Sequence, residues 1–282
     1  MLRRPFGPTG VQVPVLGQGT WAMEQDDRAG AIAALRAGID LGMTHIDTAE
    51  LYGAGVVETL VGEAIAGRRD EVFLVSKVLP SNAWSGEIVH ACEESLRRLR
   101  TDWLDCYLVH WPVRHPLEDT IEGFEELLRE GKIRSYGVSN FPVAELEEAV
   151  KLAGPGRIAC DQVLYHLGQR EIEREVLPWC EQHGIAVVGF SPLGSGRFPV
   201  ADSPDGRALG KIAAAHRVTP RQVALAFLLR EHDIFLIPKS AHVEHTRENA
   251  AALDLVLTDE NLQRLARAFP RPRRSHRGVP TL

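Results

Sequence analysis

The sequence predicts a single α/β domain folded as a (β/α)8 TIM barrel, with an N-terminal β-hairpin and an extra C-terminal helix. Short β-branched or aliphatic runs alternate eight times with longer amphipathic runs along the 282 residues, and no break in composition separates two halves. The rival architecture, two doubly wound halves, would need a Gly-rich first turn. Neither a G-x-G-x-x-G nor a G-x-x-x-x-G-K-[ST] motif occurs. Eight uninterrupted strand–helix units therefore predict one closed barrel.

The chain opens with an expected hairpin, at about residues 2–7 and 10–14, because the cluster Gly7-Pro8-Thr9-Gly10 is typical of a turn. Eight barrel strands are expected at 15–20, 44–47, 72–77, 104–110, 133–139, 159–163, 186–191 and 234–240. We expect the hairpin to occupy 1–14, the barrel 15–252, and the extra helix with a C-terminal tail 253–282, all within one domain of residues 1–282.

Each strand is followed by a segment with helical periodicity. In the segment after the third strand, the apolar residues Ile88, Ala91, Cys92, Leu96 and Leu99 recur at the spacing of one helical face. The helices are expected at 27–41, 57–66, 86–99, 117–130, 143–152, 171–183, 220–231 and 243–252, with the extra helix at 259–268.

The composition excludes several classes of protein. The chain is 44% hydrophobic and 25% charged, with a net charge of −6, so nothing favours a nucleic-acid or membrane partner. Its four cysteines form no C-x-x-C pair and are typical of reduced thiols in the cytoplasm. No secretory leader is recognisable, and no apolar run reaches the roughly 18 residues of a spanning helix. We expect a cytoplasmic protein.

Polar side chains gather at the expected strand ends, which is where the active sites of such barrels lie. The second strand ends at Asp47, with Tyr52 in the loop after it; the third ends at Lys77 and the fourth at His110. Neighbouring strands lie about 4.8 Å apart, so Asp47, Lys77 and His110 are expected to meet at one mouth of the barrel.

These four residues together solve one chemical problem. A carbonyl that accepts a hydride must also receive a proton, and tyrosine, with a pKa near 10, donates poorly unless its anion is stabilised. An ammonium at Lys77 would shift the pKa of Tyr52 downward, Asp47 would hold that ammonium, and His110 would orient the substrate oxygen. Taken singly, each has a structural alternative: Lys77 and Asp47 could form a salt bridge, and His110 could be a hydrogen-bonded core residue.

Eight motifs, in order, closely resemble the aldo/keto reductases, and especially the bacterial branch that includes methylglyoxal-reducing enzymes. They are GQGTW (17–21), HIDTAELYG (45–53), LVSKV (74–78), LVHWP (108–112), GKIRSYGVSNF (131–141), DQVLYHL (161–167), GFSPLGSG (189–196) and IPKS (237–240). The resemblance covers essentially the whole chain. It implies a (β/α)8 barrel that holds NADPH (NADP+ in its oxidised form) at its mouth without a Rossmann fold.

The resemblance also implies roles for individual residues. Tyr52 would be the acid of a tetrad with Asp47, Lys77 and His110. Ser139, Asn140 and Gln162 would bind the nicotinamide carboxamide, and Phe190 would stack on its ring. Further contacts with the coenzyme are expected from Gly19, Thr20, Trp21, Asp47, Ser191, Pro192, Leu193 and Ser195. Asp161 stands where asparagine often precedes the glutamine, and it is expected to add a charge near the mouth.

The adenosine end departs from the common family pattern. Lys239 and Ser240 match the site for the 2′-phosphate, just before an expected helix whose N-terminus favours anions, and Asn249 matches an adenine contact. Many family members have an arginine six residues after the lysine, where this chain has His245. Neutral imidazole offers less to a phosphate than guanidinium does. Because Lys239 remains, NADPH is still the expected coenzyme.

The substrate pocket is expected to have an aromatic wall of Trp21, Trp84 and Trp111, with His110 as a polar anchor, although each tryptophan could instead serve packing. The C-terminal tail carries Arg271, Arg273, Arg274 and Arg277, which are most simply a solvated segment. If the tail covered the mouth, it would favour anionic or polar substrates. The partner predicted is a small carbonyl compound, and the chain is expected to be a monomer.

Two other classes of function remain open. Some proteins of this fold act as nucleotide-sensing regulatory subunits with little turnover, an alternative that the complete tetrad disfavours. A metal-dependent hydrolase would use His45, Asp47, His110 and His166 as ligands. Lys77 would repel a divalent cation there, so no metal site is expected.

Overall fold

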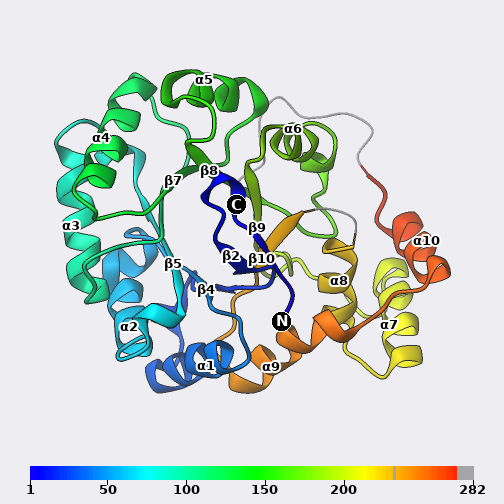
Figure 1. Cartoon of the computed structure of the whole chain (residues 1–282). Helices are drawn as coiled ribbons and strands as arrows, with labels where there is room; N and C mark the ends of the chain where they lie inside the picture. The colour runs from blue at the N-terminus through cyan, green and yellow to red at the C-terminus, as the bar shows by residue number, and fades with distance from the viewer. Residues whose placement is uncertain (231–232, 272–282) are drawn as a thin grey trace.

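The structure is a computed structural model that describes residues 1–230 and 233–271. Parallel strands form one sheet in the order β10-β9-β8-β7-β6-β5-β4-β3, and helices surround it (Figure 1). The strands are β3 (Gln18–Gly19), β4 (His45–Asp47), β5 (Phe73–Val78), β6 (Cys106–Val109), β7 (Tyr136–Ser139), β8 (Ile158–Leu164), β9 (Ala186–Phe190) and β10 (Ile234–Ile237). The (β/α)8 fold predicted from the sequence is confirmed.

The helices follow the strands in alternation. They are α1 (Arg28–Asp40), α2 (Val56–Ala64), α3 (Glu87–Leu99), α4 (Leu117–Arg129), α5 (Val143–Ala153), α6 (Val176–His183), α7 (Pro204–His216), α8 (Pro220–Leu228), α9 (Val243–Ala251) and α10 (Asp259–Ala268). In Figure 1, α7 and α10 lie side by side, outside α8.

Backbone hydrogen bonds close the barrel between its first and last strands. The amide of Gly17 donates to the carbonyl of Leu236 at 2.8 Å, and the amide of Leu236 donates to the carbonyl of Val15 at 2.8 Å. Glycine is required at this seam: a Cβ atom on Gly19 would lie 2.6 Å from the carbonyl oxygen of Ile237. The seam places Gly19 beside Lys239.

The N-terminal hairpin covers the end of the barrel at which the strands begin, and Figure 1 shows it in dark blue across the ring of strands. Its strands are β1 (Arg3–Pro5) and β2 (Gln12–Pro14). Phe6 enters the barrel from the hairpin, with ring centroids 4.7 Å from Phe73 and 5.2 Å from Phe235. At the opposite end, where the strands finish, the described residues leave a groove open.

Strand periodicity decides which side chains enter the barrel. Successive residues of a strand point to opposite faces. On β5, Phe73 and Val75 pack inside the barrel, whereas Leu74 and Val78 pack against the surrounding helices. Lys77 therefore shares the inner face with Phe73 and Val75, at the open end.

Two features of the fold differ from the sequence-based expectation. Helix α7 was not expected, although Ser203 caps it by accepting a hydrogen bond from Gly206 N and Pro204 occupies its first position. The expected helix at 171–183 is instead a 3₁₀ turn, Glu171–Glu173, followed by α6. The remaining helices agree with their expected ranges to within a few residues. The tail beyond Arg271, with Arg273, Arg274 and Arg277, lies outside the described residues.

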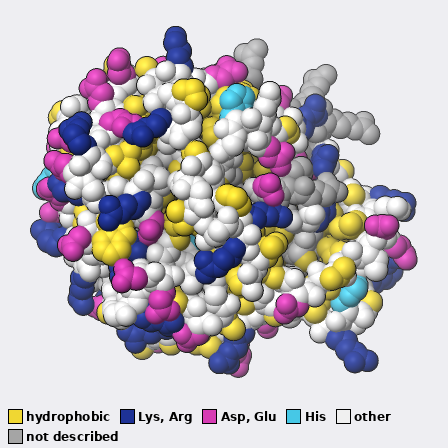
Figure 2. Space-filling view, in the orientation of Figure 1, with side chains coloured by type: hydrophobic (Ala, Val, Ile, Leu, Met, Phe, Trp, Pro, Cys, Tyr) yellow, Lys and Arg dark blue, Asp and Glu magenta, His cyan; other side chains and the backbone are white. Residues whose placement is uncertain are grey.

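The surface carries charges of both signs. Figure 2 shows basic and acidic side chains interspersed over the hairpin-covered face, without a broad patch of either sign. In the described part of the chain, no helix has the length and apolar character needed to cross a bilayer.

Candidate active site

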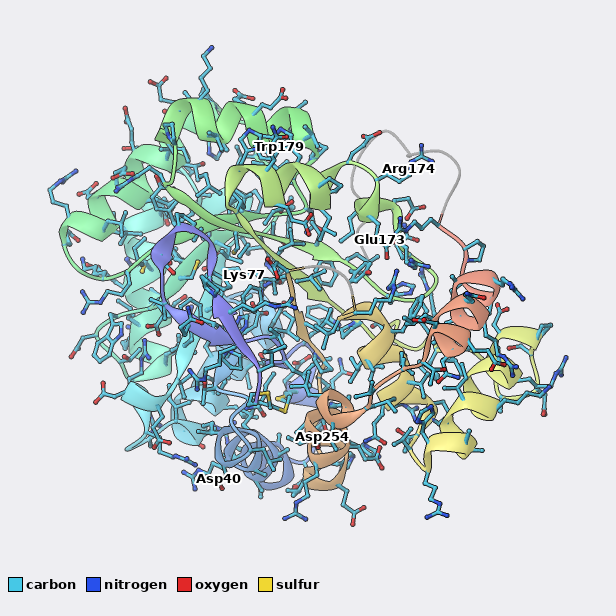
Figure 3. All side chains as sticks on the ribbon, turned by 45° about the vertical axis from the view of Figure 1, so that its right-hand side comes forward. Asp40, Lys77, Glu173, Arg174, Trp179 and Asp254 are labelled. Carbon is cyan, nitrogen blue, oxygen red and sulfur yellow. The ribbon has the colours of Figure 1, made fainter. Side chains whose placement is uncertain are left out.

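Lys77 lies at the centre of a buried polar cluster at the open mouth. Its side chain is inaccessible to solvent, and its Nζ donates to Asp47 Oδ1 at 2.5 Å, to the carbonyl of Thr48 at 2.9 Å and to Tyr52 Oη at 3.1 Å. All three N–H groups of the Lys77 ammonium thus have an oxygen acceptor, as the charged form requires. Figure 3 shows Lys77 in the middle of the ring of strands.

Asp47 is fixed from both sides. While Oδ1 accepts from Lys77, Oδ2 accepts from Gln162 Nε2 at 2.7 Å, and its backbone carbonyl accepts from Thr20 Oγ1 at 2.8 Å. Gln162 comes from β8, on the far side of the barrel from β4. The carboxylate therefore connects opposite walls of the mouth and holds the ammonium in one position.

Tyr52 reaches this cluster through an unusual backbone path. It begins a short 3₁₀ turn, Tyr52–Gly55, in which Gly53 has φ 56° and Ala54 has φ 49°. The phenol ring packs edge-on against Trp21, with centroids 5.0 Å apart, and against His110, with centroids 5.7 Å apart. Its hydroxyl thereby faces the same space as the His110 imidazole.

The electrostatic balance at Tyr52 differs from the sequence-based expectation. Burial raises the pKa of Tyr52 above its ordinary value of 10, and the opposing charge of Lys77 only partly offsets this. Lys77 thus lowers the pKa of Tyr52, as expected, but burial outweighs this effect. Burial alone would lower the pKa of Lys77, but Asp47 and Tyr52 hold it above its ordinary value. At neutral pH the phenol carries its proton beside a charged ammonium.

His110 is a neutral imidazole at any physiological pH. Burial, assisted by the charge of Lys77, lowers the pKa of His110 to about 3. Its Nδ1 has no hydrogen-bond partner among the residues described. The ring lines the groove at the mouth next to Trp111, with centroids 5.0 Å apart. It can orient an oxygen without exchanging a proton.

Three polar side chains line the groove on the wall opposite Tyr52. Ser139 Oγ donates to the carbonyl of Gln162 at 2.8 Å, and Asn140 Nδ2 donates to Ser139 Oγ at 3.0 Å and to the carbonyl of His110 at 3.2 Å. Asn140 has φ 62°, a strained conformation for a residue other than glycine. Its buried Oδ1 has no partner within residues 1–230 and 233–271. Such an acceptor can take the amide N–H of a ligand.

A strap of residues 190–199 borders the groove after β9. Ser191 has φ 50° and Ser195 has φ 45°, and Gly194 N closes the first turn on the carbonyl of Ser191 at 2.8 Å. The groove has a volume of about 1230 Å³. It runs from the aromatic side chains at the mouth, past Phe190, Ser191, Pro192, Leu193 and Ser195, to Lys239.

This groove suits an elongated coenzyme. At one end it offers the unpaired Asn140 acceptor and a half-buried Phe190 ring face, and at the other end a lysine. Those are the groups that an amide-bearing aromatic ring and a phosphate would need. The residues present therefore fit a nicotinamide nucleotide.

Lys239 is already engaged in an ion pair. Its ammonium contacts the carboxylate of Asp26, which lies in the loop between β3 and α1. Ser240 Oγ donates to the carbonyl of His242 at 2.9 Å, and Asn249 is buried on α9. His245 is exposed, with its ring edge-on to His242 at 5.3 Å. Ser240, His245 and Asn249 do not line the groove.

The three tryptophans are placed differently. Trp21 and Trp111 line the groove beside Tyr52 and His110. Trp84 does not line it; its exposed indole donates to the carbonyl of Ser81 at 3.1 Å. The structure therefore supports an aromatic wall of two tryptophans and gives Trp84 no contact with the site.

The expected charge of Asp161 near the mouth is wrong, and the alternative of a metal-dependent hydrolase gains no support, because of where these side chains point. Asp161 lies on the outer side of β8, one residue before the inward-facing Gln162, and accepts from Phe141 N at 3.4 Å. Burial raises the pKa of Asp161 well above its ordinary value. His45 lies two residues before Asp47, at the closed end, with its ring edge-on to Phe6 at 5.8 Å. Over the described ranges, no three metal-binding side chains converge.

Sequence reasoning missed two residues. Asp26 is an acid in the polar run EQDDR, and nothing local indicates that it meets Lys239, which is 213 positions away. Arg221 lines the groove from the start of α8. The only signal available for Arg221 was a cation at the start of the helix expected at 220–231.

Comparison with known proteins agrees with this geometry. Residues 15–269 match the aldo/keto reductase family. Methylglyoxal reductase YeaE of Escherichia coli (strain K12) is 45% identical over 265 residues, covering 93% of each chain. Glyoxal reductase of Bacillus subtilis (strain 168) is 34% identical over 262 residues, covering 91% of this chain and 89% of that protein.

A solved structure supports the fold over its full length. The crystal structure of an aldo/keto reductase from Klebsiella pneumoniae in complex with NADP and acetate superposes with a TM-score of 0.92. It is 44% identical and covers 100% of this chain and 99% of that one. These relatives are named as reductases, so the alternative of a nucleotide-sensing regulatory subunit gains no support from them.

Proposed function

The chain belongs to the aldo/keto reductase family, and we propose that this NADP-dependent oxidoreductase reduces aldehydes and ketones, including small ketoaldehydes such as methylglyoxal, with Tyr52 as the proton donor. The observation that carries the proposal is the buried contact of Lys77 Nζ with Tyr52 Oη at 3.1 Å, while the same ammonium contacts Asp47 at 2.5 Å. An ammonium held in this way favours a phenol that gives up its proton during the reaction.

The groove residues would hold the coenzyme, which supplies the hydride when bound. Ser139, Asn140 and Gln162 would bind the carboxamide, and the unpaired Asn140 Oδ1 would accept its N–H. Phe190 would lie against the nicotinamide ring, and the strap would cover the pyrophosphate with Ser191, Leu193 and Ser195. Lys239 would exchange Asp26 for the 2′-phosphate, with Ser240, His245 and Asn249 beside it. On the opposite wall, Gly19, Thr20 and Trp21 complete the groove.

The proton follows a short path. It leaves Tyr52 Oη for the substrate oxygen, and Lys77 stabilises the phenolate that remains. Neutral His110 donates a hydrogen bond to the same oxygen, which lowers the energy of the developing alkoxide. Asp47 keeps Lys77 in place and charged. Each of the four residues thus has one task in a single proton delivery.

The pocket wall supports small substrates. Trp21 and Trp111 stand on either side of the Tyr52–His110 pair, so a carbonyl carbon with short substituents reaches the hydroxyl between two indoles. Two relatives, named for methylglyoxal and for glyoxal, support a compact dicarbonyl. Trp84 contributes no side chain to this wall.

Replacement of Tyr52 by phenylalanine tests the proposal. Loss of a general acid costs about 10²- to 10⁴-fold in rate, and removal of one oxygen leaves the coenzyme groove unchanged. We expect Tyr52→Phe to lose at least 100-fold in kcat/KM for methylglyoxal, followed by NADPH absorbance, while its Kd for NADPH by fluorescence titration stays within twofold of wild type. Retention of most of kcat by the variant would show that the proton comes from elsewhere. A panel of ketones, aldehydes and ketoaldehydes measured with wild type would define the preferred class.

A further inference from the structure

The groove contains two basic side chains among its described lining residues, Lys239 and Arg221, and they differ in their partners. Lys239 is neutralised by Asp26. Arg221 forms no ion pair within the described part of the chain; its guanidinium lies 5.3 Å from the ring of Phe198, at the end of the strap. Among the described residues, Arg221 is thus the basic side chain of the groove that no carboxylate neutralises.

The local structure fixes where Arg221 stands. It is the second residue of α8, after Thr219 and Pro220. Thr219 Oγ1 accepts from Gln222 N and Gln222 Oε1 accepts from Thr219 N, so a capping box already uses the amides of the first turn. The Arg221 side chain, which packs on the ring of Phe198 in the strap, is therefore the group of this segment that can bind a ligand.

A second cavity adds positive charge at the same place. It has a volume of about 570 Å³, lies between α7 and α8, and shares Phe198, Pro199 and Arg221 with the groove. Arg207 and Lys211 also line it, and no acid does so among the described residues. In a chain with a net charge of −6, three cations without a carboxylate create a local positive potential that attracts anions.

The adenosine half of the coenzyme carries phosphate groups that a cation would bind. NADPH carries a pyrophosphate and a 2′-phosphate, whereas the position at which many family members have an arginine is His245, an exposed imidazole outside the groove. On the basis of the proposed function, we propose that Arg221 binds a phosphate group of the coenzyme. It would supply from α8 a guanidinium in place of the one that His245 replaces on α9, where Arg247 does not line the groove. Guanidinium suits this task because its donors contact phosphate oxygens in pairs.

Binding titrations test this assignment without turnover. Kd values for NADPH and NADH would be measured by fluorescence for wild type, Arg221→Ala and Arg221→Lys, at low and high salt, with Lys211→Ala as the matched control. Loss of a charge-assisted hydrogen bond corresponds to about 10- to 100-fold in affinity. We expect Arg221→Ala to weaken NADPH binding by that factor and to reduce its salt dependence. Arg221→Lys should restore part of the loss. Lys211→Ala removes the same charge from the neighbouring cavity without touching the groove, so it should weaken binding much less than Arg221→Ala does.

The two coenzymes identify which phosphate is bound. An equal loss for NADPH and NADH assigns Arg221 to the pyrophosphate, and a loss confined to NADPH assigns it to the 2′-phosphate. Unchanged affinity in Arg221→Ala, or a loss that lysine does not rescue and that salt does not alter, would overturn the inference while leaving the proposed function intact. Failure of wild type to bind either coenzyme would overturn both. Circular dichroism melting of each variant establishes that α8 remains folded.

Discussion

Lys77 shows how one side chain can answer both a structural and a chemical demand. Its ammonium is inaccessible to solvent and is shared by a carboxylate, a carbonyl and a phenol. A buried ion pair contributes little net stability compared with an apolar pair of the same size. Its presence at the mouth, within 3.1 Å of a phenol, is therefore better explained by the proposed reaction than by stability.

Separating the two roles needs two variants. Lys77→Met leaves the carboxylate of Asp47 buried without its cation, which costs about 3–5 kcal/mol. It also removes the charge that stabilises the Tyr52 phenolate, so we expect reduction to fall at least ~100-fold. The double variant Asp47→Asn/Lys77→Met should recover most of the stability in urea unfolding and none of the rate. Recovery of rate along with stability would make the pair purely structural.

The pH dependence of the hydride step is a second expectation at this scale. The pKa of His110 is lowered to about 3 by burial and by Lys77, and the pKa of Tyr52 is raised above 10 by burial. A donor with a raised pKa keeps its proton below that value and loses it only above it. Single-turnover reduction with deuterated NADPH should therefore be flat from about pH 6 to 9, and should decline only in more alkaline solution. An inflection near neutral pH in the isotope-sensitive rate would contradict these assignments.

At the scale of the element, strand parity made the tetrad predictable. Asp47, Lys77 and His110 each end an apolar run, so neighbouring strands of one barrel bring them to the same mouth. The close backbone approach at Gly19, on the seam between β3 and β10, came only from the structure, since the sequence reasoning gave this glycine as a coenzyme contact. Position in the sequence did not predict which way a buried polar side chain points. Asp161 faces the outer side of β8. His45 lies at the closed end of the barrel.

The rest of the site depends on contacts between elements that are distant in sequence. Helix α7 contains Gly206 and Gly210, which weaken the local helical signal, although its Ser203 cap and Pro204 were visible. Asp26 meets Lys239 only because β3 closes on β10. Arg221 reaches the groove because α8 packs beside the strap. The sequence contains no periodic pattern that would predict these contacts.

The Asp26–Lys239 pair makes a prediction about coenzyme choice. A phosphate that binds Lys239 must displace Asp26, whose charge then repels the incoming group. Partly exposed ion pairs are worth about 0.2–1 kcal/mol, so Asp26→Asn should tighten NADPH binding roughly two- to fivefold. NADH, which lacks the 2′-phosphate, should be unaffected. Asp27→Asn is the matched control, since Asp27 caps α1 through Gly30 N and does not contact Lys239. Equal tightening of both coenzymes would argue against displacement.

For the whole molecule, the two ends of the barrel are specialised in opposite ways. The hairpin fills the closed end with apolar rings around Phe6, and a Cβ on Gly7 would lie 2.2 Å from the carbonyl oxygen of Ala159. The open end holds the buried ion pair of Lys77 and Asp47. Stability is therefore built into one end and chemistry into the other, which explains how a strained mouth with residues at positive φ is tolerated.

A second buried charge cluster ties the C-terminal segment to the barrel. Glu173 has a fully buried carboxylate that accepts from Arg170 Nε and Nη2 at 2.7 Å each, from Tyr165 Oη at 2.6 Å and from Arg271 Nε at 2.5 Å. Arg170 also donates to the carbonyl of Phe269, just after α10. Figure 3 shows Glu173 well to the side of Lys77, toward α10. The cluster joins the loop after β8 to the residues that follow the last helix.

Glu173 should therefore control global stability without touching the reaction. Although burial works against its charge, bonds from Arg170 and Tyr165 and the charge of Arg230 lower the pKa of Glu173 to about 2. A depressed carboxyl pKa gives stability that is present above the unfolded value of about 4.3 and is lost as pH falls toward the folded value. Glu173→Gln leaves buried Arg170 without its anion, so we expect a loss of about 3–5 kcal/mol at pH 7.

Urea unfolding of wild type and Glu173→Gln between pH 7 and about pH 2.5 measures this contribution, because the stability difference between them should shrink as Glu173 takes up its proton. Glu171→Gln, two residues earlier in the same turn, serves as the matched control, since the carboxylate of Glu171 accepts a hydrogen bond from Gln169 and lies outside the cluster. At 25 °C and neutral pH, the kcat of Glu173→Gln should stay near that of wild type, since the cluster has no contact with the groove. A pH-independent difference would mean that the carboxylate's charge is not what holds the C-terminal segment. A loss of kcat at full folding would mean that this cluster communicates with the mouth.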